Sequence, residues 1–360
     1  MTMPRPIPRL LDPVTRLTTE DIVRTCELVL VSKPFSKKIS GLTPPTMPAA
    51  SGRVLSVQSH VVSGYVGNKN AVFALNRLGF EVDALNTTQL SNHTGFPEVT
   101  GQRLGGADVR ALWDGMKANG LTNQTHVLSG YIGDPSIVEE LAAIVRELPG
   151  REYVADPVFG DEGKFYVSSA IPRRFEELLL PLATVITPNQ FEAEVLTGVK
   201  IATLEDAARA CRVLFDKGCG LKTVVITSCG LEEREHKGHV TLVASVREFP
   251  KRVLVSRVAK VDGYFTGTGD LLAALLLGNL TKHGDVAAAV DHAVAGLQHV
   301  LRDTHAHANK GGPSEESPPA SSPAWWSRRE LRLVQNQDFL VAPQASMLSE
   351  VASTWHDVVE

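Results

Sequence analysis

From residue 53 onward, short segments rich in β-branched residues alternate with amphipathic segments, and this alternation limits the possible folds more than any other feature of the chain. Such an alternation is typical of α/β proteins with a largely parallel sheet. The expected strands are 53–57, 80–85, 126–128, 152–155, 184–186, 223–226, 239–244 and 251–256. The expected helices are 67–78, 108–119, 136–148, 172–180, 190–196, 204–217, 270–280 and 285–303. The sequence therefore predicts an α/β fold with a central, mostly parallel sheet and helices on both faces.

Shifts in composition divide the chain into four parts. Residues 1–50 are proline-rich with little periodicity, which predicts a disordered extension; scattered arginines make a transit peptide the weaker alternative. Residues 51–303 carry the α/β pattern. Residues 304–327 are rich in Ser, Pro and Gly and predict a flexible surface insertion. Residues 328–360 return to the main domain, and 331–334 alternate like an edge strand.

Composition excludes several functional classes. A formal charge of -4 gives no general attraction to nucleic acid or anionic membranes, so neither is expected as a partner. The longest apolar run, residues 271–277, is far shorter than the roughly 20 residues that span a bilayer. The cysteines show no CxxC spacing, which favours reduced thiols and a cytoplasmic location.

The turn Thr266-Gly267-Thr268-Gly269-Asp270 stands between a segment that resembles a strand (261–265) and a run of strong helix formers. Glycines let backbone N–H groups approach a ligand, and the start of a helix adds unpaired donors and a positive dipole end. Together they predict an anion site, most plausibly for phosphate. Asp270 has two interpretations: an N-cap of the helix, or a general base that takes a proton from an alcohol while the glycine amides hold a phosphoryl group.

Polar and acidic residues follow several expected strands at the point where each strand ends. Open α/β sheets bind ligands at the carboxyl ends of their strands, so these residues are expected to line one crevice. There is no P-loop motif and no G-x-G-x-x-G, which leaves the Gly-Thr-Gly-Asp turn to handle phosphate. The residues are Ser59, Tyr131, Asp156, Asp161, Thr187, Asn189, Glu192, Thr227 and Ser228.

Several motifs, taken in their order along the chain, resemble those of pyridoxal kinases in the ribokinase superfamily. The most specific are Gln58-Ser59-His60-Val61, Ser91-Asn92-His93-Thr94-Gly95 and Asn189-Gln190-Phe191-Glu192. Others are Ser129-Gly130-Tyr131, Asp156-Pro157-Val158-Phe159-Gly160-Asp161, Val225-Ile226-Thr227-Ser228 and Gly267-Thr268-Gly269-Asp270. The resemblance covers about residues 53–342, apart from the insertion. It implies a ribokinase-like three-layer sandwich, a homodimer, and ATP-dependent phosphorylation of the 5′-hydroxyl of pyridoxal, pyridoxine and pyridoxamine.

The resemblance also implies roles for individual residues. Asp270 would be the base, with Gly267, Thr268 and Gly269 stabilising the γ-phosphoryl group. Ser59, Thr94, Tyr131 and Asp270 would bind the vitamin. Asp161 would bind Mg²⁺ or another divalent cation, and Asp156, Thr187 and Thr227 a monovalent K⁺ or Na⁺. ATP as co-substrate would contact Asp156, Asn189, Gln190, Phe191, Glu192, Thr227, Ser228, Val261, Asp262, Gly263, Thr268 and Gly269.

Structural alternatives exist for several of these residues. Ser59 and Thr94 could cap local turns, Tyr131 could pack in the core, and Glu192 could be a first-turn charge favoured by the helix dipole. Two rival functions are a hydroxymethylpyrimidine kinase of the same superfamily and a non-catalytic vitamin- or nucleotide-binding protein. Set against the resemblance, the segment 162–166 would be shorter than its counterpart in the family.

Overall fold

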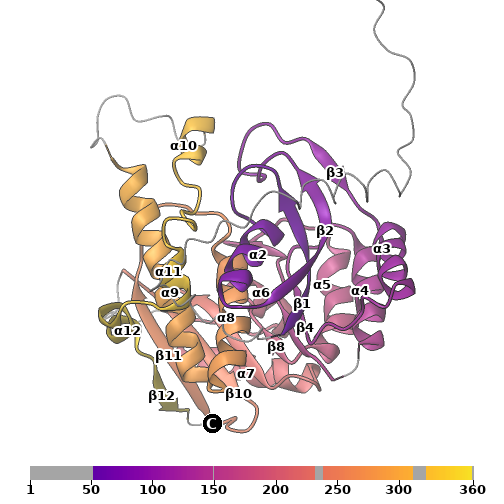
Figure 1. Ribbon diagram of the computed structural model, residues 1–360. Helices are drawn as coiled ribbons and strands as arrows, with labels where there is room; N and C mark the ends of the chain where they lie inside the picture. The colour runs from indigo at the N-terminus through magenta and orange to yellow at the C-terminus, as the bar shows by residue number, and fades with distance from the viewer. Residues whose placement is uncertain (1–51, 149, 232–237, 311–321, 359–360) are drawn as a thin grey trace, which may run out of the picture. The chain divides into compact units, whose positions relative to one another are not determined.

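A single sheet of ten strands runs through the computed structural model, in the order β12-β11-β10-β9-β8-β5-β4-β1-β2-β3 (Figure 1). The structure describes residues 52–148, 150–231, 238–310 and 322–358, all in one compact unit, Met47–Glu360. The main strands are β1 (Arg53–Val61), β2 (Glu81–Leu90), β3 (Gly101–Arg103), β4 (His126–Ser129), β5 (Glu152–Ala155), β8 (Val185–Ile186), β9 (Thr223–Cys229), β10 (His239–Val246), β11 (Arg252–Ala259) and β12 (Thr354–Asp357).

Strand direction confirms the predicted sheet type. The six central strands β2, β1, β4, β5, β8 and β9 are parallel to one another. The edges are antiparallel: β3 pairs with β2 at one edge, and β10, β11 and β12 extend the sheet beyond β9 at the other. Because six neighbouring strands point the same way, their carboxyl ends all reach the same side of the molecule.

Helices cover both faces of the sheet, and each face has its own apolar core. On one face lie α3 (Gly106–Ala118), α4 (Pro135–Glu147), α5 (Ala170–Arg174), the π-helical turn η1 (Phe175–Leu179), the 3-10 turn η2 (Leu180–Leu182), α6 (Gln190–Thr197) and α7 (Leu204–Lys217). On the other lie α2 (Asn68–Arg77), α8 (Thr268–His283), α9 (Val286–Ala308), α11 (Gln337–Val341) and α12 (Ala345–Val351). Successive strand residues point to opposite faces, so Val54 joins the second core and Leu55 the first. This is the expected three-layer arrangement.

Helix α8 occupies a central position on its face. Its residues Leu271–Leu277 are all buried, as expected for a helix that is apolar on every side. A β-carbon at Gly278 would lie 2.4 Å from Leu78 Cδ1, so this glycine permits the close contact between α8 and the end of α2. Among the described residues, no helix is long and apolar enough to cross a membrane.

Four expectations about local structure were wrong. Residues 261–265 form a loop after β11 instead of a strand. Residues 331–334 alternate in burial but form turns, and the edge strand is β12. The helix expected at 172–180 is divided into α5, η1 and η2. Residues 304–308 complete α9 and 323–327 form α10 (Pro323–Ser327), so parts of the expected insertion are helical. Residues 1–50 and 311–321 lie outside the described residues.

Two short strands in the middle of the chain were not expected. They are β6 (Gly160–Asp161) and β7 (Lys164–Phe165), which form a separate antiparallel hairpin. The turn of this hairpin places Glu162 at φ 47, in the left-handed region. The hairpin therefore includes most of the segment 162–166.

Candidate active site

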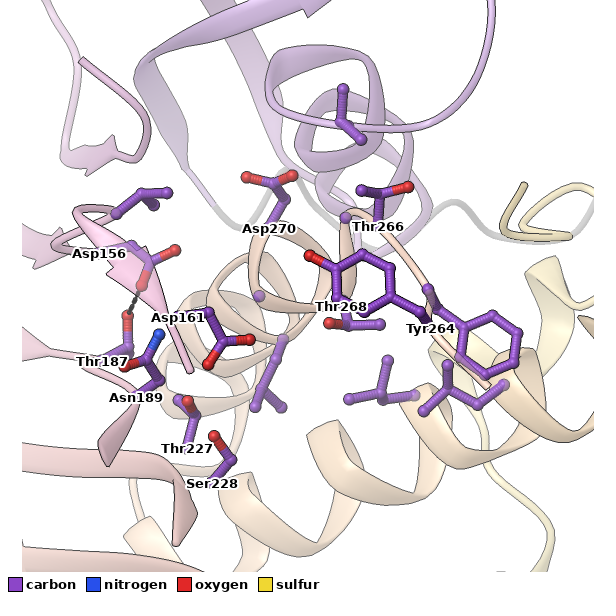
Figure 2. Close-up of a pocket in the computed structure, with 18 of the residues that line it drawn as sticks. Asp156, Asp161, Thr187, Asn189, Thr227, Ser228, Tyr264, Thr266, Thr268 and Asp270 are labelled. Carbon is purple, nitrogen blue, oxygen red and sulfur yellow. Dashed lines mark hydrogen bonds between the residues drawn. The ribbon is translucent and has the colours of Figure 1, made fainter. Parts of the chain in front are cut away.

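A cavity of about 560 Å³ opens at the carboxyl ends of the parallel strands. Figure 2 shows its central part, with side chains from the strand ends facing the first turn of α8. Most of the residues expected to form a site lie in its wall: Ser59, Thr94, Tyr131, Asp156, Asp161, Thr187, Asn189, Glu192, Thr227, Ser228, Val261, Gly263, Gly267, Thr268, Gly269 and Asp270. The structure thus brings together residues that the chain carries more than 200 positions apart.

Three of the expected nucleotide contacts do not lie in the wall of the cavity. The amide of Gln190 donates to Ile201 O at 2.7 Å and its oxygen accepts from Gly230 N at 2.9 Å. The ring of Phe191 packs edge-on against Phe165 at 5.0 Å. Asp262 is exposed, and its backbone oxygen contacts His305 Nδ1 at 2.7 Å. The polar and aromatic groups of Gln190 and Phe191 therefore make contacts within the protein.

The backbone at the start of α8 requires glycine at position 267. Gly267 has φ 82, which is left-handed, and a β-carbon there would lie 2.3 Å from Tyr65 O. Its own carbonyl accepts a hydrogen bond from Asn70 Nδ2 at 2.7 Å. Gly267 is also the N-cap, so the unpaired N–H groups of the first helical turn follow it directly. The turn therefore has the geometry of an anion site.

Asp270 lies in the first turn of α8 and does not cap it. One of its carboxylate oxygens accepts a hydrogen bond from Gly67 N at 2.7 Å, so the N-cap interpretation of this residue was wrong. Burial raises the pKa of Asp270, and the Gly67 hydrogen bond acts in the opposite direction. A carboxylate with a raised pKa and a side chain in a cavity wall is a candidate general base.

Asp156 lies on the strand side of the cavity, at the end of β5. Thr187 Oγ1 donates to Asp156 Oδ1 at 2.8 Å, the contact drawn as a dashed line in Figure 2. Burial and then the negative charge of Asp270 raise the pKa of Asp156. The two carboxylates therefore repel each other in a partly desolvated space, and a bound cation would relieve that repulsion.

Glu192 has both carboxylate oxygens engaged by backbone N–H groups. One accepts from Phe159 N at 2.9 Å and Gly160 N at 3.4 Å, and the other accepts from Asn189 N at 2.9 Å. Asn189 in turn accepts from Glu192 N, which completes a capping box at the start of α6. Burial and the charge of Asp156 raise the pKa of Glu192. Its main contacts hold the loop between β5 and β6 against α6.

Acidic side chains outnumber basic ones in the described wall of the cavity. The carboxylates are Asp156, Asp161, Glu162, Glu192 and Asp270, and the lysine and arginine side chains are Lys260 and Arg103. Within the described ranges, no three carboxylates, histidines or cysteines converge on one point. An anionic ligand would therefore need cations bound with it, and the oxygen donors present suit hard cations that also take oxygens from phosphate and water.

One end of the cavity is apolar and was not identified from the sequence. Its wall is made by side chains of β10, β11, α8 and α9, which come together only in the folded sheet: Val240, Leu242, Val258, Leu272, Val294, Leu297 and Leu301. Apolar walls of this kind suit a flat heteroaromatic ring. Period-2 and helical periodicity identify these residues as core-facing, but cannot separate the wall of a cavity from packed core.

Aromatic and basic residues that the sequence did not single out also lie in the wall. Tyr166 follows the β6–β7 hairpin and is hydrogen-bonded to Tyr264 in the loop before α8; burial is the main cause of the raised pKa of Tyr166. His93 lies beside Thr94, and Arg103 ends β3. His93 belongs to the Ser-Asn-His-Thr-Gly motif, so the motif was a signal for it.

Comparison with known proteins supplies independent information. Residues 122–315 match the family model described as phosphomethylpyrimidine kinase. The chain is 41% identical over 321 residues to the pyridoxal kinase of Arabidopsis thaliana, covering 86% of this chain and 98% of that protein. It is 40% identical to the human pyridoxal kinase, covering 81% of this chain and 96% of that protein.

A solved structure gives the same result for the fold. The pyridoxal kinase from Leishmania donovani in complex with ADP and pyridoxamine superposes with a TM-score of 0.73 at 32% identity. The match covers 86% of this chain and 100% of that chain.

Proposed function

The chain belongs to the pyridoxal kinase family, and from this premise we propose that it transfers the γ-phosphoryl group of ATP to the 5′-hydroxyl of pyridoxal, pyridoxine and pyridoxamine. The observation that carries the proposal is the partly buried Asp270 carboxylate at the glycine-built start of α8, inside the cavity formed by the strand ends. This combination supports a base beside an anion site.

In the proposed reaction the 5′-hydroxyl gives its proton to Asp270 as its oxygen attacks the γ-phosphorus. The bond from that phosphorus to the bridging oxygen breaks, and ADP leaves with the electron pair. The amides of Gly267, Thr268 and Gly269 stabilise the charge on the transferring group. Gly67 fixes the orientation of the Asp270 carboxylate through its 2.7 Å hydrogen bond. The raised pKa brings Asp270 closer to the pH at which it must accept a proton.

The two ends of the cavity support an assignment of the two substrates. The apolar end between β10, β11, α8 and α9 suits the adenine ring, with Val261, Gly263, Thr227, Ser228 and Asn189 in the adjoining wall. The polar end carries Ser59, Thr94 and Tyr131, which suit a pyridine ring with hydroxyl and aldehyde groups. Asp270 lies in the first turn of α8, and Figure 2 shows it across the cavity from Asp156 and Thr187 at the strand ends.

The donor sets support two cation positions. Asp161 supplies a carboxylate on the β6–β7 hairpin and would hold Mg²⁺ together with phosphate oxygens and water. Asp156, Thr187 and Thr227 supply oxygens that would hold K⁺ or Na⁺. Bound cations supply positive charge that offsets the repulsion between the phosphates and the acidic wall.

Further proposals rest on the resemblance and on composition. They are a homodimer, a cytoplasmic location, and an N-terminal extension that ends near residue 50. Light scattering on the purified full chain tests the first of these.

A second candidate function follows from the description of the matching family model, which names a phosphomethylpyrimidine kinase. A coupled assay that follows ADP release with pyridoxal, pyridoxine, hydroxymethylpyrimidine and hydroxymethylpyrimidine phosphate at matched concentrations separates the two. Turnover of pyridoxal above that of hydroxymethylpyrimidine supports the main proposal. The reverse order, or turnover of neither, contradicts it.

A further inference from the structure

Glu330 joins the C-terminal part of the chain to two loops at the cavity. One oxygen of its carboxylate accepts a hydrogen bond from Tyr65 N at 3.1 Å. The other lies 3.2 Å from Nε2 of the buried His93. Gly64 leaves space for this carboxylate, because a β-carbon there would lie 2.6 Å from both Glu330 oxygens. A single side chain thus contacts the loop after β1 and the loop after β2.

The hydrogen bonds of His93 determine its tautomer. Nδ1 accepts from Gly95 N at 3.1 Å, so this nitrogen carries no proton. The ring proton of the neutral imidazole therefore lies on Nε2, which faces both Glu330 and Thr266 Oγ1, each at 3.2 Å. The single Nε2 proton is shared between Glu330 Oε1 and Thr266 Oγ1, so Thr266 Oγ1 is an acceptor in this contact. The hydroxyl proton of Thr266 is then free to be donated toward the cavity, whose wall includes Thr266.

The residues next to these contacts are those of the proposed reaction. Tyr65 is two positions before Gly67, whose amide orients Asp270. His93 precedes Thr94 at the vitamin end, and Thr266 precedes Gly267 at the anion turn. Glu330 therefore acts, directly or through His93, on the loops that hold the base, the vitamin and the transferring phosphoryl group.

Packing of α10 holds this arrangement in place. Trp326 is 8% exposed and packs edge-on against His93 at 5.1 Å and against Tyr264 at 5.8 Å. Arg329 N bonds to Trp326 O at 2.9 Å, so the backbone turns directly from α10 toward Glu330. The indole of Trp326 thus packs against one side of the His93 ring, and the carboxylate of Glu330 contacts Nε2, which carries the ring proton.

We propose that Glu330 is a positioning residue for the phosphoryl-transfer site, acting through His93 and the Tyr65 amide on the vitamin end of the cavity. This inference rests on the proposed function, because it assumes that the vitamin binds beside Thr94 and Thr266. The proposal gives residues 322–330, which include Glu330, a role in substrate selection and turnover as well as in packing.

The test compares Glu330→Gln with Arg332→Gln in the full chain. A glutamine at 330 keeps the volume, but Tyr65 N and His93 Nε2 face different oxygens of Glu330, so in the variant one of them would face an NH2 group that cannot accept. Arg332 is the matched control: it lies two positions further along the same segment, and it bonds away from the cavity, to Asp303 Oδ2 at 2.7 Å. For each variant we would measure kcat and KM for pyridoxal, the Kd of ADP and the melting temperature.

We expect Glu330→Gln to lower kcat/KM for pyridoxal by about tenfold or more, the loss typical of one charge-assisted hydrogen bond. The Kd of ADP should stay within about twofold, because the polar contacts of Glu330 are with Tyr65 and His93 and not with residues proposed for the adenine end. Arg332→Gln should leave kcat/KM unchanged. Equal kcat/KM values in the two variants, whatever their melting temperatures, would overturn the inference.

Failure of the proposed function would look different. In that case the unaltered protein would not turn over pyridoxal, and the comparison of Glu330→Gln with Arg332→Gln would be made on whichever alcohol the coupled assay identifies.

Double substitution with His93→Ala adds a second readout. If Glu330 acts mainly through His93, Glu330→Gln should have a much smaller effect in the His93→Ala background.

Discussion

The amide of Gly67 donates a hydrogen bond to the carboxylate of Asp270 at 2.7 Å, and so connects the loop after β1 to the first turn of α8. Residue 67 needs glycine for this contact. Its φ is 54, and a β-carbon would lie 2.1 Å from Ser59 O. A carboxylate held by a backbone amide has one orientation toward the cavity, which is the property that a general base requires.

Replacing Asp270 by Asn should abolish most of the activity. The amide retains an oxygen that can accept from Gly67 N, but it cannot take the proton of the substrate hydroxyl. We expect kcat to fall by about 10²- to 10⁴-fold, with the Kd of ADP within about threefold of its original value. Asp262→Asn is the control, because Asp262 lies in the nearby loop outside the cavity wall. A kcat for Asp270→Asn close to that of Asp262→Asn would exclude Asp270 as the base.

Alanine at position 267 should disrupt the anion turn. The substitution combines a left-handed φ of 82 with a β-carbon 2.3 Å from Tyr65 O. We expect a loss of about 1–3 kcal/mol in the free energy of unfolding, together with a fall in kcat.

The matched substitution for this experiment is Gly115→Ala within α3. No atom lies within 4 Å of the added β-carbon, so the change should stabilise the protein by about 0.5–1 kcal/mol through helix propensity. Urea unfolding measures both variants. A Gly267→Ala protein as stable as Gly115→Ala would show that the turn tolerates a side chain.

Removing the charge of Asp156 should change the response of the protein to cations. Its pKa is raised, so the charged form opposes folding, and that cost appears as the pH rises from the ordinary carboxyl range through the raised pKa. We expect Asp156→Asn to be more stable than the unaltered chain at pH 8 in cation-free buffer, by about 1 kcal/mol or more.

The same variant should gain less stability than the unaltered chain when K⁺, Mg²⁺ and ADP are added together. Melting temperatures with and without these additions measure the effect, and Asp262→Asn again serves as the control. Equal gains in Asp156→Asn and the unaltered chain would count against a cation at Asp156.

Glu147 should contribute stability that depends on pH. It accepts from Lys117 Nζ at 2.7 Å, Trp113 Nε1 at 3.0 Å and Arg110 at 2.9 Å. These bonds, led by that from Lys117, lower the pKa of Glu147 to about 2. Because the folded pKa is depressed, the stabilisation is complete above the unfolded pKa of roughly 4.3 and is lost as the pH falls toward about 2.

We therefore expect Glu147→Gln to lose about 0.5–1 kcal/mol at pH 7, a value that allows for solvent screening of a side chain 31% exposed. The difference from the unaltered chain should shrink between pH 4 and pH 3 in urea titrations. Glu248→Gln, which removes an exposed carboxylate, controls for the loss of one charge. A difference that stays constant across this range would show that the effect does not depend on the ionisation of Glu147.

Local pattern was sufficient for most of the fold. The strand 152–155 and the helix 204–217 were predicted with the bounds that the structure has. The helix has a strong helical period, and the strand is a short buried run that ends at Asp156-Pro157. Thr203 accepts a hydrogen bond from Asp206 N and so forms a capping box at the start of that helix. Elements that form only by pairing with a distant segment of the chain were missed. Strand β12 (Thr354–Asp357) is polar and is defined by pairing with β11.

Residues 331–334 have alternately buried side chains but do not form a strand. Leu331 and Leu333 are both buried, so their alternation was a true signal of core-facing side chains. No strand of the described sheet pairs with them. Leu333 N bonds to Leu331 O and Asn336 N to Leu333 O, so the backbone turns instead. Alternation reports which side chains are buried, and only the neighbouring backbone determines whether a ladder forms.

By itself, the sequence determined the α/β architecture, the anion turn before α8 and the set of polar residues at the strand ends, because each depends on local periodicity, glycine positions or motif order. Tertiary structure alone decided that Asp270 meets the amide of Gly67, 203 positions earlier, and that Glu330 meets the amide of Tyr65, 265 positions earlier. Contacts at such separations depend on how the loops are placed by the sheet and its helices, and no local pattern in the chain carries that information.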